Sequence, residues 1–525
     1  MSTEDISGLD GLHFDVAIVG AGINGASAAQ HLSAAGYSVL VVDQGDFADG
    51  ATSRSSRLLH CGLRHLASGE GLWSTLSRPR RLLRSMGTAR DDMLARDEIV
   101  NSIPHRLTAI NFCLPIYRND AYAPWHIDLA FKLLRVMSPR GVALDYRRYR
   151  HGKLEQIPIG PWLRDPDNLS GVAVFREYLF DWPERIALDA LFDARRLGAE
   201  THNYTQVVEL ERLQESNAWR LTLNSANPKQ PHGQSRETGM ARVTADMVLN
   251  LAGAWVDKII AGTGRSIAPK CAPIKGIHIA LRLPQAFAGW GLFTYNSIGE
   301  PLYCLPSNGF HYIGLTRRPF DSENAGVSAS DDEIDWMIAE TNRCLPQLAV
   351  TRADVLFTWA GVNPLTFDAE APLGSREITL HNLAADGLPG MLTLTGGPIV
   401  THRRVANRLL RAVRQRLPPS GSQQQIQFQR IGPEGESDPA QITSEAFDVS
   451  VAEVRRCAHD EQPRNLADLL MRRLGVGWAS DQGLALARPV AEIAAAELGW
   501  SDTRVEDELR AYRQHLKVVR RQPGS

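Results

Sequence analysis

The sequence predicts an α/β fold: a parallel sheet with helices on its faces, an interleaved antiparallel region, and a small C-terminal helical domain. Three observations carry this prediction. Short apolar runs alternate with a helical segment near the N-terminus, as in βαβ units. Residues 203–250 alternate and carry charged turns, and residues 270–320 are again rich in strand formers. After about residue 440 the apolar spacing becomes helical.

The elements follow one another along the chain. Residues 14–19 are a predicted strand, 24–35 an alanine-rich helix and 38–42 a second strand. Late in the chain, a buried strand is predicted at 392–395 and a helix at about 402–417. The predicted C-terminal helices are 451–458, 466–474, 481–498 and 503–518.

Two regions are expected from this order, 14–430 and 440–525. Residues 418–422 read Pro-Pro-Ser-Gly-Ser and are followed by glutamines, which is the composition of a linker. A chain of 525 residues also exceeds what one hydrophobic core supports, so several packed domains are expected.

Composition excludes several classes of function. The net charge of −2 argues against general nucleic-acid binding, because no strong positive field would attract phosphates. The six cysteines form no C-x-x-C pair, which argues against a zinc site or a redox dithiol and fits a reducing compartment. No metal site is expected.

The N-terminus and the apolar runs bear on targeting and on insertion into a membrane. The acidic, polar N-terminus has no signal-peptide pattern, and no run of about eighteen apolar residues occurs. We therefore expect a cytoplasmic protein. The basic run Arg78–Arg84 leaves two interpretations open: peripheral contact with the inner face of the cytoplasmic membrane, or a solvated helix face.

Residues 20–25 read Gly-Ala-Gly-Ile-Asn-Gly, between a predicted strand and a predicted helix. Gly20 makes the tight turn, Gly22 lets a pyrophosphate approach the backbone, and Gly25 lets helix and strand pack closely. The helix N-terminus adds N–H groups and a positive dipole for the phosphates. Asp43 ends the next strand, where an acid accepts hydrogen bonds from a ribose and disfavours a 2′-phosphate. This pattern predicts a dinucleotide site.

The segments that follow point to a family. Residues 51–64 read Ala-Thr-Ser-Arg-Ser-Ser-Arg-Leu-Leu-His-Cys-Gly-Leu-Arg, which resembles a signature of the FAD-dependent glycerol-3-phosphate dehydrogenases. Further segments resemble that family in the same order: 250–256, 275–278, 361–365 and 396–404. The resemblance covers about residues 14–410 and, more loosely, 445–520.

This resemblance implies a Rossmann-like FAD-binding domain interleaved with an antiparallel-sheet substrate domain. It implies an enzyme that oxidises an alcohol by hydride transfer to flavin N5 and passes electrons to a quinone or another acceptor. The resemblance leaves open whether the protein forms a homodimer. The expected cofactor contacts are Gly20, Gly22, Ile23, Asn24, Gly25, Asp43, Thr52, Ser53, Ser56, Leu58, His60, Gly253, Gly397 and Thr401.

The substrate side is expected to be cationic, because arginine forks suit phosphate. His278 is the expected base. Arg64 is expected to bind substrate and to assist catalysis. The other expected substrate contacts are Arg317, Asn363 and Arg376.

Four positions depart from the family's pattern. Asn363 replaces an arginine, Pro398 a lysine, His65 a tyrosine and Arg317 an acid. The expected substrate is therefore glycerol 3-phosphate or a related small phosphorylated or anionic alcohol. A flavin oxidase acting on a non-phosphate substrate and a non-catalytic flavoprotein stay open as alternatives.

Overall fold

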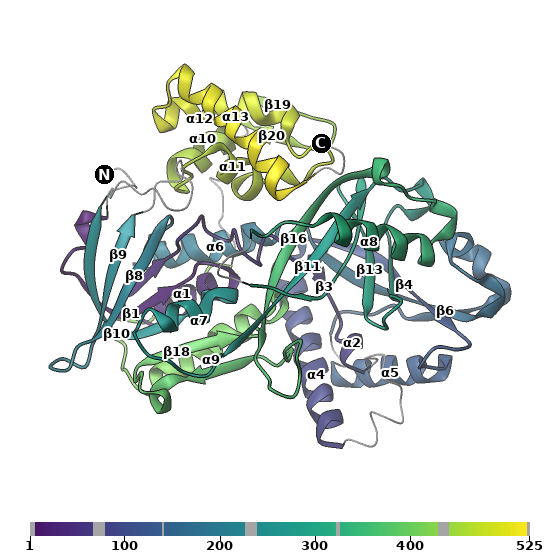
Figure 1. Cartoon of the computed structure of the whole chain (residues 1–525), viewed down its shortest axis with the longest axis horizontal. Helices are drawn as coiled ribbons and strands as arrows, with labels where there is room; N and C mark the ends of the chain where they lie inside the picture. Colours follow the sequence, from purple (N-terminus) through teal and green to yellow (C-terminus); the bar gives the residue numbers. More distant parts are fainter. Residues whose placement is uncertain are drawn as a thin grey trace.

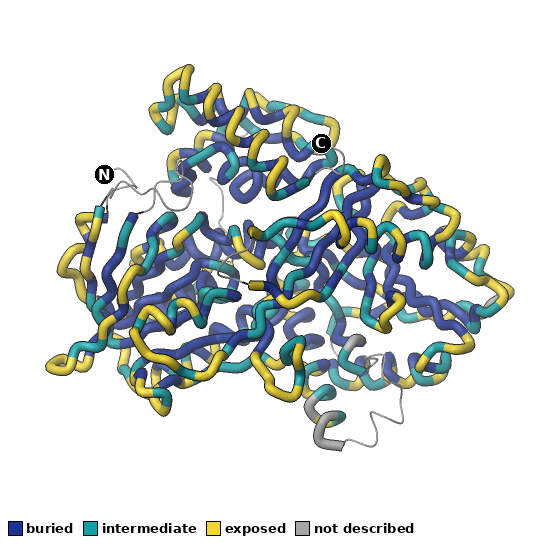
Figure 2. The backbone as a smooth tube through the Cα atoms, in the orientation of Figure 1, coloured by how far each residue is buried: buried dark blue, intermediate teal, exposed yellow. Residues whose placement is uncertain are grey.

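The computed structural model describes residues 6–66, 79–138, 141–225, 239–321, 326–428 and 440–521. Arg78 and the side chains of Arg64, Arg80, Arg81 and Arg84 lie outside what it describes. Two large sheets lie side by side, and the C-terminal helices lie over the junction between them (Figure 1). Buried segments follow the strands of both sheets (Figure 2).

The first sheet holds the predicted βαβ unit. Strand β1 (His13–Val19) pairs in parallel with β2 (Val39–Val42) and with β10 (Met240–Asn250). The strand order is β17-β18-β10-β1-β2-β7. The outer strands are β7 (Glu200–His202), β18 (Met391–Thr395) and β17 (Thr379–Asn382). The helices α1 (Ile23–Ala34), α6 (Pro183–Arg196) and α9 (His402–Arg414) pack on one face.

The antiparallel insert predicted at 203–250 is confirmed. Strands β8 (Thr205–Arg212) and β9 (Trp219–Ser225) pair antiparallel, and β9 pairs antiparallel with the first half of β10. Their apolar side chains, including Trp219 and Leu221, form a second core against the other face of the sheet. Burial on both faces explains why β1 ends in an unbroken apolar run, residues 16–19.

The second sheet is mostly antiparallel, with the order β15-β11-β14-β13-β12-β4-β6-β3 and with β16 beside β11 and β5 beside β6. Its strands are β3 (Leu58–Leu59), β4 (Leu107–Tyr117), β5 (Arg147–Arg150), β6 (Leu169–Phe180), β11 (Cys271–Leu281), β12 (Trp290–Tyr295), β13 (Pro301–Ser307), β14 (Phe310–Gly314), β15 (Arg318–Pro319) and β16 (Val355–Thr366). The chain enters each sheet repeatedly, so the predicted interleaving is confirmed.

Helices cover the second sheet and the segments between the sheets. They are α2 (Leu63–Leu66), α4 (Pro79–Ser102), α5 (Pro124–Met137), α7 (Val256–Ala261) and α8 (Asp331–Cys344). Helix α2 packs on α4, as Figure 1 shows at the lower edge of the molecule.

The C-terminal region is helical, as predicted. It contains α10 (Val451–Asp460), α11 (Leu466–Asp468) with a π turn at Leu469–Arg473, α12 (Leu484–Leu498) and α13 (Asp502–Val519), and a short hairpin of β19 (Gln441–Thr443) and β20 (Asp448–Ser450). The helix predicted at 481–498 begins three residues later. Gly483 precedes it with φ of +73°, a conformation outside the α-helical region.

Residues 418–422 form no helix or strand and are exposed, and the segment makes backbone contacts with the end of α1. Gly421 N donates to Gly36 O, and Gln424 N donates to Ala34 O, each at 2.7 Å. Ala34 O belongs to the last turn of α1 and Gly36 O lies just after its C-cap, where no intrahelical donor is available. The segment therefore docks along the first sheet's helices, for a reason that its composition does not reveal.

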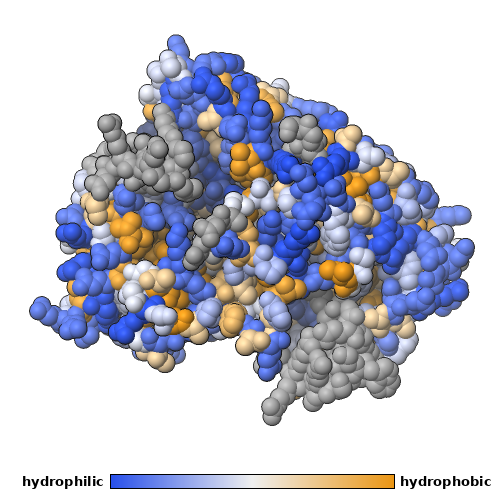
Figure 3. All heavy atoms as spheres, viewed as in Figure 1, coloured by the Kyte–Doolittle hydropathy of each residue, from blue (hydrophilic) through white to orange (hydrophobic). Residues whose placement is uncertain are grey.

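No helix within the described ranges combines the length and the apolar character needed to cross a bilayer. The face in Figure 3 is largely hydrophilic over the C-terminal helices and over the far end of the second sheet.

Candidate functional site

A cavity of about 800 Å³ lies between the two sheets, at the carboxyl ends of β1, β2 and β10, where α/β sheets bind ligands. Most of the expected cofactor contacts line it: Gly20, Gly22, Ile23, Asn24, Asp43, Thr52, Ser56, Leu58, His60, Gly253 and Gly397. Its volume lies within the range of small-molecule sites.

The glycine turn has the shape that its sequence predicts. Gly20 has φ of +104°, and a Cβ there would lie 2.6 Å from Leu251 O. A Cβ on Gly25 would lie 1.9 Å from Gly20 O, so this position serves close helix–strand packing and does not line the cavity. Gly22 leaves its face open except for Thr52 Oγ1, 3.3 Å from an added Cβ. These glycines form a cradle that any side chain would fill.

Asp43 lies beside this turn. Its Oδ2 accepts from Ala21 N at 2.7 Å, and its Oδ1 accepts from Gly45 N at 3.0 Å. Burial raises the pKa of Asp43 to about 6, against the two backbone donors, which lower it. The carboxylate thus holds the glycine turn and lines the cavity, an arrangement that fits a ribose hydroxyl.

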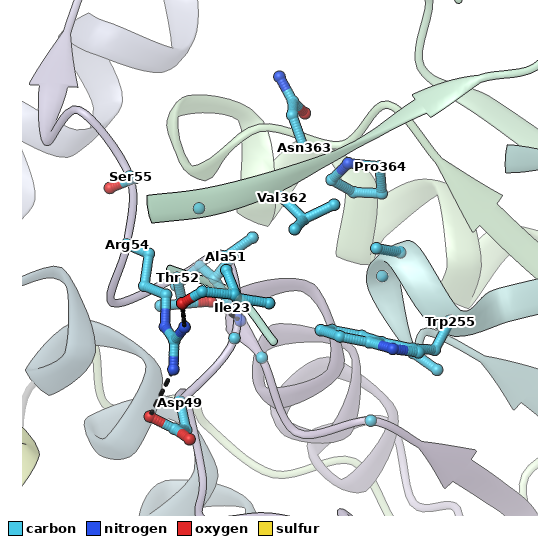
Figure 4. A pocket seen from close by; sticks show the side chains of 18 of the residues that line it. Ile23, Asp49, Ala51, Thr52, Arg54, Ser55, Trp255, Val362, Asn363 and Pro364 are labelled. Carbon is cyan, nitrogen blue, oxygen red and sulfur yellow. Dashed lines mark hydrogen bonds and ion pairs between the residues drawn. The ribbon is translucent and has the colours of Figure 1, made fainter. Parts of the chain in front are cut away.

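The segment after Asp43 wraps around the start of α1. Thr52 Oγ1 accepts from Ile23 N at 3.0 Å, and Arg54 points toward Asp49, 3.9 Å away (Figure 4). Ser53 lies outside the cavity lining, because its Oγ donates to the carbonyls of Asp49 and Gly50. Ser53 therefore shapes the loop from behind.

Two further turns close the cofactor side. Asn24 Nδ2 donates to Gly397 O at 2.7 Å, which joins α1 to the turn after β18. Thr401 is buried before α9, donates to Pro398 O at 3.3 Å and lies outside the lining. Gly253 has φ of +61°, and an added Cβ would enter open space there.

The other end of the cavity carries the expected substrate residues. Arg317, Asn363 and Arg376 all line it. Arg317 Nη1 donates to Glu300 Oε1 at 2.8 Å, so its charge is already balanced by a carboxylate. The Asn363 side chain points away from the Ile23 and Thr52 side of the cavity (Figure 4).

His278 lines the cavity but is only 1% exposed. Its ring stacks on Trp359, with centroids 4.7 Å apart, and meets the edge of Tyr312. Burial lowers the pKa of His278 to about 3. Neither ring nitrogen has a hydrogen-bond partner among the described residues. His278 is thus a neutral imidazole at physiological pH.

A second histidine has a different setting. His60 lines the cavity, and its Nδ1 lies 3.4 Å from Oδ2 of Asp92, a buried residue of α4. A carboxylate at that nitrogen orients an imidazole and stabilises its charged form. The sequence placed His60 near the flavin but could not reveal Asp92, which lies 32 positions further on.

The end of α13 also contributes to the site, which the sequence did not predict. Val518 and Val519 line the cavity, although they lie in the C-terminal region. Only the docking of that region brings them there, so no local pattern could have identified them.

Comparison with known proteins gives the same picture. Residues 15–403 match the family model "FAD dependent oxidoreductase", and residues 423–505 match the model "C-terminal domain of alpha-glycerophosphate oxidase". A glycerol-3-phosphate dehydrogenase of Synechocystis sp. is 28% identical over 407 residues, which cover 76% of this chain and 69% of the relative. An aerobic glycerol-3-phosphate dehydrogenase of Staphylococcus aureus is 26% identical, with 77% and 67% covered.

Solved structures share the fold. A glycerol-3-phosphate dehydrogenase from Bacillus halodurans complexed with FAD has a TM-score of 0.67 at 19% identity, covering 98% of this chain and 96% of its own. An L-alpha-glycerophosphate oxidase from Mycoplasma pneumoniae with FAD bound has a TM-score of 0.57 at 15% identity, with 80% and 99% covered. The predictions of fold class, family and FAD are confirmed. This chain belongs to the family of FAD-dependent oxidoreductases and is a flavoenzyme related to the glycerol-3-phosphate dehydrogenases.

Proposed function

We propose that the protein oxidises a small phosphorylated or otherwise anionic alcohol to the carbonyl compound, with glycerol 3-phosphate as the first candidate. One observation carries this proposal. The cavity that holds the glycine cradle and Asp43 continues to a polar end with Arg317, Asn363 and Arg376. When bound, FAD supplies the two-electron acceptor that takes the hydride. We propose a quinone as the final electron acceptor, as the resemblance to the FAD-dependent glycerol-3-phosphate dehydrogenases implies.

The substrate anion would be held by the cations at this end. Because Glu300 already pairs with Arg317, Arg317 contributes less positive charge than a lone arginine would. We propose Arg376, which lines this end of the cavity, as a phosphate clamp together with Arg64. Arginine suits that role because its planar fork can donate two parallel hydrogen bonds to an oxyanion.

The hydroxyl proton requires a base, and we propose His60 in preference to His278. With Nδ1 of His60 facing Asp92, its Nε2 lies on the opposite edge of the ring and can accept a proton. The buried His278, with its pKa near 3, is a poor acceptor. His278 would instead shape the cavity wall through its stack on Trp359.

Anaerobic titration tests both parts of the proposal. Glycerol 3-phosphate is expected to bleach the visible flavin absorbance, and glycerol is not. His60→Ala is expected to keep its flavin but to slow bleaching by about 100- to 10,000-fold. His459→Ala, an exposed histidine far along the chain, is the matched control. A full rate in His60→Ala would refute His60 as the base, and no bleaching by any phosphorylated polyol would refute the substrate class.

An oxidase is the second candidate. The match of residues 423–505 to a glycerophosphate oxidase domain favours it. Hydrogen peroxide formed during turnover without an added acceptor would identify an oxidase, whereas turnover that depends on a quinone would identify a dehydrogenase.

Asp43 makes FAD binding depend on pH. Its carboxyl has a pKa of about 6, and only the deprotonated form accepts from both ribose and backbone donors. FAD affinity is therefore expected to rise from about pH 5 to pH 7 and then to level off. The fluorescence of flavin released from the protein at each pH measures this affinity.

Asp43→Asn provides the comparison. It is expected to bind FAD about 10- to 100-fold more weakly at pH 7, through loss of a charge-assisted hydrogen bond. It should also lose the pH dependence. An unchanged pH profile in this variant would assign the titration to another group.

A further inference from the structure

A second cavity, of about 340 Å³, adjoins the cofactor cavity. We propose that it binds the electron acceptor, in the form of a planar and mostly apolar ring with carbonyl oxygens, such as that of a quinone. The inference rests on the proposed function, because it concerns how the reduced enzyme is reoxidised. It gives the acceptor an entrance of its own, separate from the polar substrate end.

This second cavity lies at one end of the second sheet. The start of β4 pairs there with the end of β6, and the β13–β14 hairpin and the loop 283–289 complete the walls. Inside, the lining is apolar and buried, with Ile110, Leu179 and Phe310. The exposed residues at its mouth are Thr108, Pro284, Gln285, Ala288, Asn308 and Gly309. A small molecule could therefore enter from solvent, and the volume lies within the range of small-molecule sites.

A thin wall separates the two cavities. Arg57 and Phe180 line both of them. Tyr312 lines the second cavity, and its ring meets that of His278 edge-on, with centroids 5.7 Å apart. The Tyr312 hydroxyl donates to Ser56 O at 2.8 Å. Because His278 and Ser56 line the cofactor cavity, a single layer of side chains divides the two spaces.

Arg57 supplies a donor at this wall. Its Nη1 donates to Asp181 O at 2.9 Å, and its Nη2 donates to Glu184 Oε1 at 2.7 Å. The guanidinium also stacks on Trp478, 3.6 Å from the ring centroid. Its Nε is buried and has no hydrogen-bond partner among the described residues. A guanidinium held in this way keeps one N–H for a carbonyl oxygen of the acceptor and can stabilise the negative charge that develops there.

The lining suits an apolar ring better than a second phosphate. Among the described lining residues Arg57 is the only arginine or lysine, and Glu184 already balances its charge. His311 also lines the cavity, but its Nε2 contacts Phe287 O at 3.0 Å and burial lowers its pKa. A doubly charged anion would lose its hydration here without gaining matching cations, whereas an apolar ring gains from burial.

The electrons and protons balance. The acceptor ring takes two electrons across the wall and two protons from water at the open mouth, and it leaves as a hydroquinone. When bound, reduced FAD supplies both electrons and releases one proton to solvent. Two electrons therefore pass, and one proton is consumed overall.

Reoxidation tests the proposal without any alcohol substrate. The FAD-loaded enzyme is reduced anaerobically by light and EDTA and is then mixed in a stopped-flow instrument with menadione, a naphthoquinone without a long tail. The rate at which the flavin absorbance returns is expected to saturate with menadione concentration, because a binding site fills. A rate that rises linearly without saturation would overturn the proposal.

Two variants place a bulky side chain in the second cavity. Ala288→Trp and Ser307→Trp are each expected to keep their FAD and to raise the half-saturating menadione concentration by about tenfold or more, because overpacking opposes occupancy. Ala109→Trp is the matched control. Ala109 is exposed on β4, but it lies outside the cavity lining because successive side chains of a strand point to opposite faces. Half-saturation that is unchanged in both Ala288→Trp and Ser307→Trp would contradict the proposed site.

Equilibrium dialysis of menadione against the oxidised, FAD-loaded enzyme measures binding without turnover. A single menadione is expected to bind each wild-type and Ala109→Trp chain, and to bind both Ala288→Trp and Ser307→Trp more weakly. Equal binding to all four proteins would place menadione elsewhere. Failure of glycerol 3-phosphate to bleach the flavin would count against the proposed substrate only, because neither measurement uses it.

Discussion

Replacing Gly25 with alanine is expected to yield a protein that no longer retains FAD and that melts at a lower temperature. The added Cβ would lie 1.9 Å from Gly20 O and 3.0 Å from Gly20 C. Both are backbone atoms, so no side chain can turn aside. Gly20 is itself held against Leu251, because its own Cβ position lies 2.6 Å from Leu251 O.

The overlap can be relieved only if α1 moves away from β1. Overpacking costs about 1–3 kcal/mol where side chains can adjust, and more is expected here. Movement of α1 also withdraws the N–H groups and the dipole that hold the pyrophosphate. The ratio of flavin to protein after desalting and the melting temperature measure the two effects.

Gly152→Ala is the matched control. An added Cβ there has nothing within 4 Å, Gly152 shows no positive φ, and it lies outside the cavity lining. This variant should stay yellow and melt as the wild type does. A yellow Gly25→Ala protein with a normal flavin ratio would show that α1 tolerates the displacement, contrary to this account.

The cofactor half of the site could be predicted because its information is local. Gly20, Gly22 and Asp43 lie within 24 positions of one another, and a strand, a turn and a helix must follow in that order. Thr52 was also predictable, since the segment 51–64 carries the family's pattern. The sequence could not show that Ser53 and Thr401 lie outside the cavity lining, because the same local pattern contains both cavity-facing and inward-facing side chains.

The substrate half depends on contacts between distant segments. Arg317 and Asn363 could be placed by motif, but the ion pair of Arg317 with Glu300 depends on how two loops of the second sheet meet. Asp92 approaches His60 because α4 and the segment around β3 share one apolar core, which includes Leu58 and Met93. The sequence alone showed that the substrate half departs from the family's pattern. The structure shows which charged groups lie beside the changed residues, as Glu300 lies beside Arg317.

The docking of the C-terminal helices was the least predictable feature, because it depends on buried ion pairs. Arg472 and Arg473 come from the π turn after α11, and both contact Asp46, more than 400 positions earlier in the chain. Asp46 also accepts from Asn203 Nδ2 at 2.8 Å. Arg472 and Arg473 are 4% and 0% exposed. Two adjacent arginines in a helical segment would ordinarily be expected at the surface.

Replacing Arg473 with methionine is therefore expected to destabilise the protein by about 1.5–3 kcal/mol, because buried Asp46 loses one of its two arginine partners and keeps only Arg472. Burial alone would raise the pKa of Asp46, yet Arg473 and Arg472 hold it at about 2. This pKa is below the ordinary 3.8, so the pair stabilises the fold at neutral pH, and the stabilisation is lost as pH falls from about 4 to 2. Denaturant unfolding at pH 7 and pH 3 measures both effects, and the difference between wild type and variant should shrink at the lower pH.

FAD retention should fall with stability in Arg473→Met, because the same docking brings Val518 and Val519 to the cavity wall. Arg488→Met is the matched control. Arg488 pairs with Glu492 and Glu506, but it is 52% exposed, and such surface pairs contribute only about 0–1 kcal/mol. If Arg473→Met is as stable as Arg488→Met and keeps its flavin, the buried pairs to Asp46 do not hold the C-terminal helices in place. If only Arg473→Met loses both stability and flavin, the C-terminal region acts as a wall of the cofactor site as well as a separate helical unit.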